Sequence, residues 1–397
     1  MKILMVFHLD AYPPVFGAAK REFPFFRENC KRHTLSLISP GSPALGMEVT
    51  DLFGKNTRRI VFVDTRRPRI FSLLIRIWLF LTGKSSFHLY HSTRFQKALD
   101  KLFAEEHFDL IHCATVLLSF YRFPPGIPMV ADTQNVEYDI FFRSYQQARG
   151  LQKLYYKIEY RRGKKMELRC FECFDAVITT TERDLNVFRK DILNTKMCTI
   201  SSGVEEMFLE PQEMKPEPWT MLFTGLMDYH PNSHGILYFL DEIFPLILKE
   251  APEARVFIVG AKPSGGLLRR ASENVIVTGY VPDVREYMRR AQVFIIPLLI
   301  GGGIRTKALE AMAIKIPIVS TTIGCEGIYL KHEESALFAD TPGEFASAVL
   351  RFFKDRELCT RFVEKAHASL LKHYSWEASG LALERVYQSV LGKGIKG

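Results

Sequence analysis

The chain has 397 residues, of which 47% are hydrophobic, and a formal net charge of +9. This hydrophobic content supports packed cores, and the length favours two domains over one. The seven cysteines are an odd and scattered set, which excludes a disulfide-rich secreted scaffold and suits a reducing compartment. The positive charge favours anionic partners. Nucleic acid is the weakest of these, because no helix-turn-helix, zinc-finger or RNP-like pattern accompanies the basic residues.

Targeting and metal signals are weak. The N-terminal MKILMVF is too short for a signal peptide, and no stretch reaches the roughly 20 apolar residues of a membrane span. Cys170 and Cys173 form a C-x-x-C pair, but no second pair stands at zinc-ligand spacing, so we expect two half-buried helix residues there. We therefore expect a cytoplasmic protein without a bound metal.

The first residues predict a β-strand followed by a helix. Lys2–Leu9 is apolar, AYPPVFGAAKR ends the strand, and a helical pattern covers Lys20–Cys30. By itself, Gly17 after two prolines is ordinary turn chemistry. Further strands are expected at His33–Ser39 and Arg59–Asp64.

The segment from Arg66 to Lys84 mixes aromatic and aliphatic side chains with arginines. One interpretation is a helix on a membrane surface, with its apolar face in the interface and its cations toward lipid phosphates. The other is an ordinary packing helix with polar ends. Both interpretations are open on the sequence.

The next strands are expected at Asp109–Cys113 and Pro128–Ala131, and the second leads into ADTQNVEYD. In this loop Gln134 can orient a hydroxyl or sugar group by hydrogen bonds but cannot take a proton. A basic surface helix is expected over Gln147–Arg169, followed by a strand and a helix start over Ala176–Asp184.

The proline-rich, acidic stretch before Thr220 is the best linker in the chain. It divides the sequence into an N-terminal domain (1–200), the linker (201–219), a C-terminal domain (220–374) and a last segment (375–397). Strands and helices alternate on both sides, which predicts an α/β fold with two doubly wound, Rossmann-like domains. Ligands in such sheets bind at the carboxyl ends of the strands, where Gly225, Gly260 and Gly279 are expected.

The stretch VFIIPLLIGGGIRTKALEAMAIKIPIVS, residues 293–320, outlines a strand, a glycine turn, a helix and a second strand. The turn consists of Gly301, Gly302 and Gly303. Glycines let a ligand approach the backbone N–H groups, and the helix behind them adds the positive end of its dipole. Arg305 and Lys307 fall in the expected first turn, where a bound phosphate would balance their charge.

Glu310 shares a helix face with Thr306 and Lys307, so its carboxylate can accept hydrogen bonds from a ribose diol. The alternative is a solvated face whose charge pair is worth only about 0.2–0.5 kcal/mol. Three glycines, two cations and an acid in a single turn favour a phosphate and sugar site.

With FTGLMDYHPN (223–232) and VTGYVPDVREYMRRA (277–291), this stretch resembles the C-terminal half of retaining glycosyltransferases of family 4, which have the GT-B fold. The likeness covers nearly the whole chain and is similar to a branch with transferases of exopolysaccharide systems. Family members usually carry two glutamates eight positions apart; Glu310 is the second, and Gly302 stands at the first. Many also have a histidine where Gln134 stands.

The resemblance implies two domains facing a cleft and the retaining transfer of a sugar from a nucleotide diphosphate sugar to a saccharide or lipid-linked acceptor. It implies Arg305, Lys307 and Gln134 as catalytic residues and a last helix that crosses back to the N-terminal domain. The implied donor-binding residues are Gly17, Arg21, Gly225, Gly260, Tyr280, Val281, Gly301, Gly302, Gly303, Thr306 and Glu310. No D-x-D motif is present, so no metal or other cofactor is expected.

Two other functions are open. One is a nucleotide-sugar epimerase on the same fold. The other is a catalytically degenerate partner subunit that binds a nucleotide, which Gly302 and Gln134 suggest. A dehydrogenase is disfavoured because no G-x-G-x-x-G follows the first strand of either domain.

Overall fold

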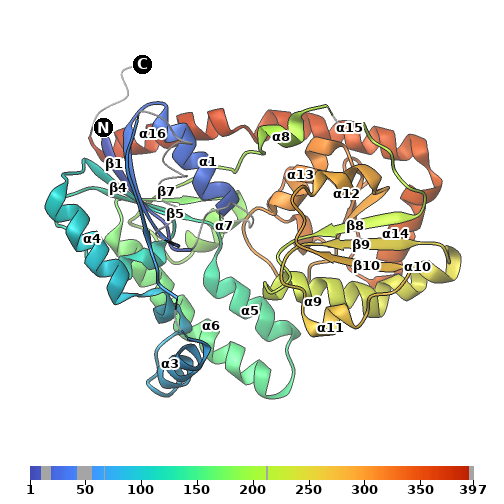
Figure 1. Cartoon of the computed structure of the whole chain (residues 1–397), viewed down its shortest axis with the longest axis horizontal. Coiled ribbons are helices and arrows are strands. Elements are labelled where there is room, and N and C mark those ends of the chain that lie inside the picture. Colours follow the sequence, from blue (N-terminus) through green and yellow to red (C-terminus); the bar gives the residue numbers. More distant parts are fainter. Residues whose placement is uncertain (10–18, 43–55, 67, 212, 393–397) are drawn as a thin grey trace. The chain divides into compact units, whose positions relative to one another are not determined.

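The computed structural model describes residues 1–9, 19–42, 56–66, 68–211 and 213–392. The chain forms two compact units. Unit 1 comprises Met1–Ser202 and Trp376–Gly397, and unit 2 comprises Gly203–Ser375. Each unit contains a parallel sheet with helices packed on it (Figure 1).

The described part of unit 1 contains a seven-stranded sheet in the order β3-β2-β1-β4-β5-β6-β7, and every pairing in it is parallel. The strands are β1 (Lys2–Val6), β2 (Thr34–Pro40), β3 (Thr57–Val63), β4 (Leu110–Cys113), β5 (Met129–Thr133), β6 (Ala176–Thr179) and β7 (Lys196–Thr199). From β1 the chain adds β2 and β3 on one side of the sheet, and it then adds β4 to β7 on the other side. The strand order therefore reverses between β1 and β4, which makes this position a topological switch point.

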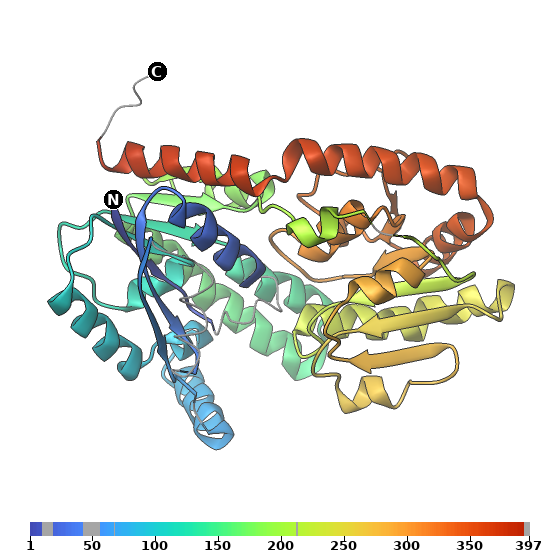
Figure 2. The same cartoon turned by 45° about the horizontal axis from the view of Figure 1, so that its top comes forward.

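The α-helices in the described part of unit 1 are α1 (Ala19–Cys30), α3 (Arg69–Leu81), α4 (Thr93–Glu105), α5 (Glu137–Gln147), α6 (Gly150–Cys170), α7 (Glu182–Phe188) and α16 (Trp376–Val390). The last helix packs along α1, as Figure 2 shows. Its Tyr387 hydroxyl is 2.8 Å from His112 Nδ1 on β4. The C-terminal helix is thus part of the hydrophobic core of unit 1.

The described part of unit 2 contains a six-stranded parallel sheet in the order β10-β9-β8-β11-β12-β13. Its strands are β8 (Thr220–Thr224), β9 (Arg255–Val259), β10 (Val275–Gly279), β11 (Val293–Ile296), β12 (Ile318–Ser320) and β13 (Leu337–Phe338). Its helices are α8 (Glu206–Leu209), α9 (His230–Tyr238), α10 (Phe244–Glu250), α11 (Gly265–Leu268), α12 (Arg285–Arg290), α13 (Thr306–Ile314), α14 (Pro342–Lys354) and α15 (Arg356–His373). The switch point of this sheet lies between β8 and β11.

Some elements differ from the sequence expectations. β11 ends at Ile296 because Pro297 follows and has no N–H for the sheet ladder. The stretch that reads as a linker contributes Val204 and Phe208 to the core of unit 2, so residues 203–219 pack with that unit. The strand β7 and the helices α4 and α5 have no counterpart among the predicted elements.

Helix starts follow local capping chemistry. The Thr341 side chain accepts from Glu344 N and the Glu344 side chain accepts from Thr341 N, which forms a capping box at the start of α14. At α5 the cap comes from a distant residue, because Glu167 on α6 accepts hydrogen bonds from the backbone N–H groups of Glu137 (3.1 Å) and Tyr138 (2.9 Å). Burial raises the pKa of Glu167 well above its usual value.

Candidate functional site

The candidate site of unit 2 begins at the glycine turn that follows β8. Gly225 has φ +155°, a conformation that side chains rarely adopt. A Cβ atom at this position would lie 2.7 Å from Asn232 Nδ2 and 2.9 Å from Lys307 Nζ. Gly225 therefore leaves room for two polar side chains directly against the backbone at the switch point.

Lys307 brings a positive charge to this turn from the first turn of α13. Its Nζ donates to Asn232 Oδ1 (2.9 Å) and lies 4.1 Å from the centre of the Phe223 ring. Asn232 is itself fixed, because its Nδ2 donates to Leu226 O (2.9 Å). The ammonium group is thus placed beside the carboxyl end of β8 and the first turn of α9, where an anion would be stabilised by both the charge and the backbone N–H groups.

Arg305 differs from its prediction. It precedes α13 instead of lying in its first turn, and its side chain is 7% exposed. The guanidinium donates to Gly303 O, to Ile323 O (2.6 Å) and to Glu326 O (3.4 Å). The expectation of a cation that is misplaced without a ligand is therefore wrong, because backbone carbonyl groups surround it and it joins the glycine loop to the segment after β12.

The glycine loop itself is shaped around this arginine. A Cβ at Gly301 would lie 2.9 Å from Arg305 Nη2, and Gly303 has φ +63°. Gly302 lies between them and is half-buried. The loop therefore requires glycine for packing as well as for any approach of a ligand to its backbone.

Glu310 and Thr306 lie on α13, on the face of Lys307. Glu310 is 5% exposed, and Thr306 is half-buried at the first position of the helix. The neighbouring Ala308, Leu309 and Met312 are buried in the core of unit 2, which fixes the rotation of the helix. Residues 306, 307 and 310, which are predicted to lie together at the glycine loop, are thus all on one short helix whose other face is packed in the core.

The predicted donor residues of the neighbouring strands lie at the same edge of the sheet. Gly260 follows β9 with φ +153°, and a Cβ there would lie 1.8 Å from Gly225 O, so the two turns are in direct backbone contact. Tyr280 and Val281 follow β10; Tyr280 is 63% exposed and Val281 is half-buried. The turns after β8, β9 and β10 therefore form one continuous rim.

In unit 1, Arg21, which is predicted to contact the donor, lies buried in the core of the unit. Its side chain is 2% exposed and forms a bidentate ion pair with Asp132, in which Nε lies 2.7 Å from Oδ2 and Nη2 lies 2.8 Å from Oδ1. It also donates to Ser202 Oγ (3.0 Å) and Ile200 O (2.8 Å), and it stacks on Phe25. A guanidinium that is bonded in this way serves the core of unit 1 and has no surface for a phosphate. Gly17 lies outside the described residues.

Gln134 lies in the loop after β5 and is half-buried. Its side-chain Nε2 donates a hydrogen bond to Glu22 Oε1 on α1 (3.0 Å), and its backbone carbonyl oxygen accepts a hydrogen bond from Thr180 Oγ1 (3.3 Å). Glu22 is 2% exposed and lies 3.3 Å from His8 Nδ1. The structure thus brings together a histidine, a buried carboxyl group and the predicted glutamine.

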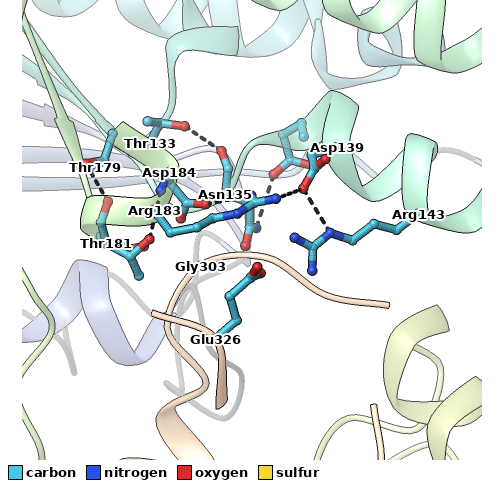
Figure 3. Close-up of polar contacts among 12 residues, drawn as sticks. Thr133, Asn135, Asp139, Arg143, Thr179, Thr181, Arg183, Asp184, Gly303 and Glu326 are labelled. Atoms are coloured by element: carbon cyan, nitrogen blue, oxygen red, sulfur yellow. Dashed lines mark hydrogen bonds and ion pairs between the residues drawn. The ribbon is translucent and has the colours of Figure 1, made fainter. Parts of the chain in front are cut away.

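A second polar cluster lies beyond the ends of β5 and β6 (Figure 3). The Asp139 carboxylate on α5 accepts hydrogen bonds from Arg143 Nε (2.9 Å) and Arg183 Nη2 (2.5 Å). Arg183 Nη1 also donates a hydrogen bond to Asp184 Oδ1 (3.1 Å). Thr181 Oγ1 accepts from Asp184 N (3.1 Å) and so caps α7. In this cluster two arginine charges are compensated by two carboxylate charges, and the Arg183–Asp139 contact connects α7 to α5.

Among residues whose placement is described, no group of three or more His, Cys, Asp or Glu side chains is arranged to hold a metal ion. None of the described helices is long and apolar enough to cross a membrane.

Comparison with known proteins identifies the C-terminal part. The family of glycosyl transferases group 1 matches residues 218–355. That segment contains the Gly225 turn, the glycine loop and α13. Unit 2 carries a group 1 glycosyl transferase domain.

Curated relatives match over part of their length. A 44.6 kDa protein in the cps region of Klebsiella pneumoniae is 28% identical over 144 residues, 34% of this chain and 37% of that one. A phosphatidyl-myo-inositol mannosyltransferase of Mycolicibacterium smegmatis is 25% identical over 184 residues, 45% of this chain and 47% of that one. The chain therefore spans less than half of the length of these relatives.

The likeness among solved structures extends over both units. The Anabaena protein HepE, solved in complex with UDP-glucose, superposes with a TM-score of 0.70 at 12% identity and covers 98% of this chain and 100% of that one. At this level of identity the likeness shows the fold. The chain has the two-domain α/β fold of GT-B glycosyltransferases.

Sequence reasoning missed the residues of unit 1 that surround Gln134. Glu22 reads as an ordinary residue of the first helix, and His8 as the end of a strand. The only sequence signal is position: His8 follows the first strand, and a ligand site is expected at that end of a doubly wound sheet.

Proposed function

We propose that the chain transfers a glycosyl group from a nucleoside diphosphate sugar to a saccharide or lipid-linked acceptor, in the synthesis of a cell-surface polysaccharide or glycolipid. Three facts support this proposal: the family match of unit 2, the mannosyltransferase among the relatives, and the fold shared with a protein that was solved with UDP-glucose.

The observation that carries the proposal is the position of Lys307. Its ammonium group lies at the switch point of unit 2, against the Gly225 turn. Bond cleavage between the sugar and the diphosphate leaves negative charge on the departing diphosphate. A cation that is already oriented by Asn232 stabilises that charge without further reorganisation, and such preorganised groups supply large contributions to catalysis.

The test is nucleotide binding by calorimetry with UDP, GDP and ADP. We expect Lys307→Gln to weaken binding of the preferred diphosphate by about 1.5–3 kcal/mol, roughly 10- to 150-fold, because a charge-assisted contact is lost. Lys315→Gln, at the exposed far end of α13, is the matched control and should bind normally. Equal affinities of the two variants would contradict the proposal, as would a wild-type protein that binds none of the three nucleotides.

Glu310 is proposed to hold the ribose of the donor. Glu310→Gln keeps the shape of the side chain but removes a charged acceptor, so nucleoside diphosphates should bind about 1.5–3 kcal/mol more weakly, while inorganic pyrophosphate should bind as before. Parallel losses for pyrophosphate and nucleotide would place the effect in the fold of α13 instead.

Retention of the anomeric configuration and independence of metal are also part of the proposal. The anomeric proton coupling of the product, measured by NMR, distinguishes retention from inversion. Measurement of activity in excess EDTA tests whether the reaction requires a metal ion. An inverted product would contradict retention, and loss of turnover that Mg²⁺ or Mn²⁺ restores would contradict metal independence.

We also propose that unit 1 binds the cytoplasmic face of an anionic membrane. The helix α3 projects from the sheet of unit 1 in both views (Figures 1 and 2) and exposes large apolar side chains. These are Phe71, Leu74, Ile77, Trp78 and Leu81, with exposed fractions of 59, 56, 49, 53 and 77%. Their spacing places several of them on one side of the helix, as in helices that lie in a membrane interface.

The neighbouring helix extends this surface. Phe80 on α3 lies 6.2 Å from the Tyr155 ring on α6, and Leu151 and Leu154 in the first turns of α6 are exposed. Cations flank the apolar groups: Lys84 Nζ lies over the Trp78 ring, and Arg76, Lys153 and Lys157 are exposed. This combination suits anionic lipid, with apolar groups in the interface and cations at the phosphates.

Vesicle sedimentation at low salt tests this surface, with phosphatidylglycerol-containing and pure phosphatidylcholine vesicles. The double variant Trp78→Gln/Leu81→Gln should lose binding, and Arg76→Gln/Lys84→Gln should lose the preference for anionic lipid. Leu268→Gln/Leu371→Gln removes two exposed leucines of unit 2 and serves as the control. Wild-type protein that stays in the supernatant with anionic vesicles would show that α3 has another partner.

A further inference from the structure

Two histidines stand one helical turn apart at the start of α9 in unit 2. His230 is the first residue of the helix and is exposed, and His234 follows four positions later and is half-buried. Side chains four positions apart lie on the same face of a helix, one above the other. Two histidines at this spacing can bind one metal ion through both imidazole rings.

The distance between the two rings fits one shared ion. Their centres are 5.7 Å apart, and their planes are inclined by 37°. An ion that forms bonds of about 2.0–2.1 Å to one nitrogen of each ring lies roughly 3 Å from each ring centre, so two ring centres on one ion lie about 5–6 Å apart. The backbone of α9 therefore already holds the rings at the separation that a bridging ion requires.

One ring nitrogen of this pair lacks the contact that a structural histidine usually has. Nδ1 of His234 is buried and has no hydrogen-bond partner among the residues that the structure describes. Buried side-chain nitrogen atoms are normally hydrogen-bonded, and a bound ion is one of the causes of an exception. This observation is independent of the spacing of the two histidines, and it also indicates a ligand at the pair.

The pair lies on the side of α9 that faces away from the Lys307 contact. Asn232 is two positions from each histidine, so at 3.6 residues per turn its side chain is rotated by about 160° from both. The Asn232 side chain contacts Leu226 O and Lys307 Nζ, which fixes the direction of that face. The histidine pair is thus separate from the proposed donor site.

The helix α9 has little tendency to form by itself. Its sequence HPNSHGILY contains an asparagine, a serine and a glycine, which are weak helix formers, and Tyr229 at the N-cap lacks the short oxygen-bearing side chain of a good cap. Closing the first turn is the costly step of helix formation. An ion bound at positions 230 and 234 links that turn to the next one and so stabilises it.

We propose that His230 and His234 form a site for one divalent transition-metal ion, of the class of Zn²⁺, Ni²⁺ and Cu²⁺, that holds the first turn of α9. One nitrogen of each ring binds the ion. Water completes the coordination, because no third His, Cys, Asp or Glu of the described residues is arranged to join them. Imidazole suits these ions, whereas Mg²⁺ and Ca²⁺ prefer oxygen ligands. The ion takes no part in the proposed glycosyl transfer, and the inference does not depend on that transfer.

Calorimetric titration with ZnCl₂ tests the site, with the full chain free of any histidine tag and of chelators. His230→Gln and His234→Gln should each weaken zinc binding at least about tenfold, since even the loss of a group that only supports a metal ligand costs 10- to 100-fold. His107→Gln removes an exposed histidine of unit 1 and should leave the affinity within about twofold. A wild-type chain that binds no zinc would overturn the inference, and so would equal affinities of wild type and both variants.

Electron paramagnetic resonance with CuCl₂ identifies the ligands directly in the wild-type chain, whatever the substitutions do to the fold. The spectrum at less than one Cu²⁺ per chain should show splitting from two ligand nitrogens, and each folded single variant, checked by near-ultraviolet circular dichroism, should show one. A wild-type spectrum without nitrogen splitting would overturn the inference. The same nitrogen splitting in the double variant His230→Gln/His234→Gln would overturn it as well.

Hydrogen exchange tests whether the ion holds the helix. With free Zn²⁺ at about ten times Kd, exchange of the α9 amides through local opening should slow about tenfold, because a ligand that binds only the closed helix lowers the opening by the factor 1 + [L]/Kd. The double variant should show no change with zinc. Exchange in wild-type α9 that zinc does not slow would overturn the holding role of the ion.

Discussion

The two units have the same strand order around their switch points but use their cations differently. In unit 1 Arg21 on α1 is buried, forms an ion pair with Asp132, and donates hydrogen bonds to Ser202 Oγ and Ile200 O. In unit 2 Lys307 has an Asn232 partner and an aromatic ring, and lies against a glycine turn. A cation in a βα motif can therefore serve as the partner of a buried carboxylate, as Arg21 does, or lie at a glycine turn, as Lys307 does, and its contacts distinguish the two cases.

Arg305 stands between these two cases. It belongs to the glycine motif, like Lys307, but its guanidinium donates to carbonyl oxygens of its own unit, as that of Arg21 does. The proposed leaving-group role therefore fits Lys307 better than Arg305, whose guanidinium is bonded to backbone carbonyl groups of unit 2. Four variants test this difference between the two units, and they follow in order of their expected effect on stability.

Arg21→Ala should have the largest effect. It leaves the buried carboxylate of Asp132 without its partner, and the loss of one member of a buried ion pair typically costs about 3–5 kcal/mol. Urea denaturation followed by near-ultraviolet circular dichroism measures the loss. Arg21→Lys should recover only part, because an ammonium group cannot make both contacts to the carboxylate. A loss below about 1 kcal/mol would mean that water replaces the guanidinium and that this site is open to ligands.

Arg305→Ala should come second, with a loss of about 2–3 kcal/mol, because hydrogen bonds from a charged donor to carbonyl groups of the loop are removed. The measurement is the urea midpoint, with and without UDP. If the variant keeps wild-type stability but loses turnover, Arg305 acts on the donor directly and the original prediction is restored.

His112 tests the buried network of unit 1 through pH. Burial lowers its pKa to about 4, and Asp132 and Arg21 act on it in opposite directions. The unfolded chain then binds the proton more tightly, so stability is complete above the ordinary pKa of about 6.5 and falls as the pH drops toward 4. At pH 5 the loss should be about 2 kcal/mol. His112→Gln should remove this loss.

The comparison for His112 is the difference between the thermal midpoints of wild type and variant from pH 7.5 to 5. Glu22, Glu137 and Glu167 have raised pKa values, so their contribution to stability falls as the pH rises, with the opposite sign. These groups are present in both proteins and cancel in the difference. A midpoint difference that does not change with pH would show that His112 is protonated in the folded chain.

Lys307→Gln should have the smallest effect on stability, within about 1 kcal/mol, since a single hydrogen bond to Asn232 and the contact with Phe223 are altered. The thermal midpoint of the nucleotide-free protein provides the measurement. Substitution of Lys307 should therefore weaken nucleotide binding and change stability little. Substitution of Arg21 should lower stability and change nucleotide binding little. A drop as large as that of Arg21→Ala would remove the distinction between the two units.

Much of the fold could be predicted from the sequence because strand and helix patterns are local. Runs such as Asp109–Cys113, of which Leu110–Cys113 forms β4, are set by side chains that follow one another in the chain. Residues 306, 307 and 310 could be placed on one helix face by spacing alone. The glycine loop and the alternation of strands and helices were sufficient to indicate an α/β fold with a ligand site.

What the sequence could not decide is the partner of each polar side chain. Arg21 and Asp132 are 111 residues apart in the sequence, and Glu22 and Gln134 are 112 residues apart. The sequence determined which residues carry charge and which segments form strands. The tertiary fold settles which charges are neutralised inside a unit and which lie at a glycine turn, because burial and hydrogen-bond partners depend on contacts between distant parts of the chain.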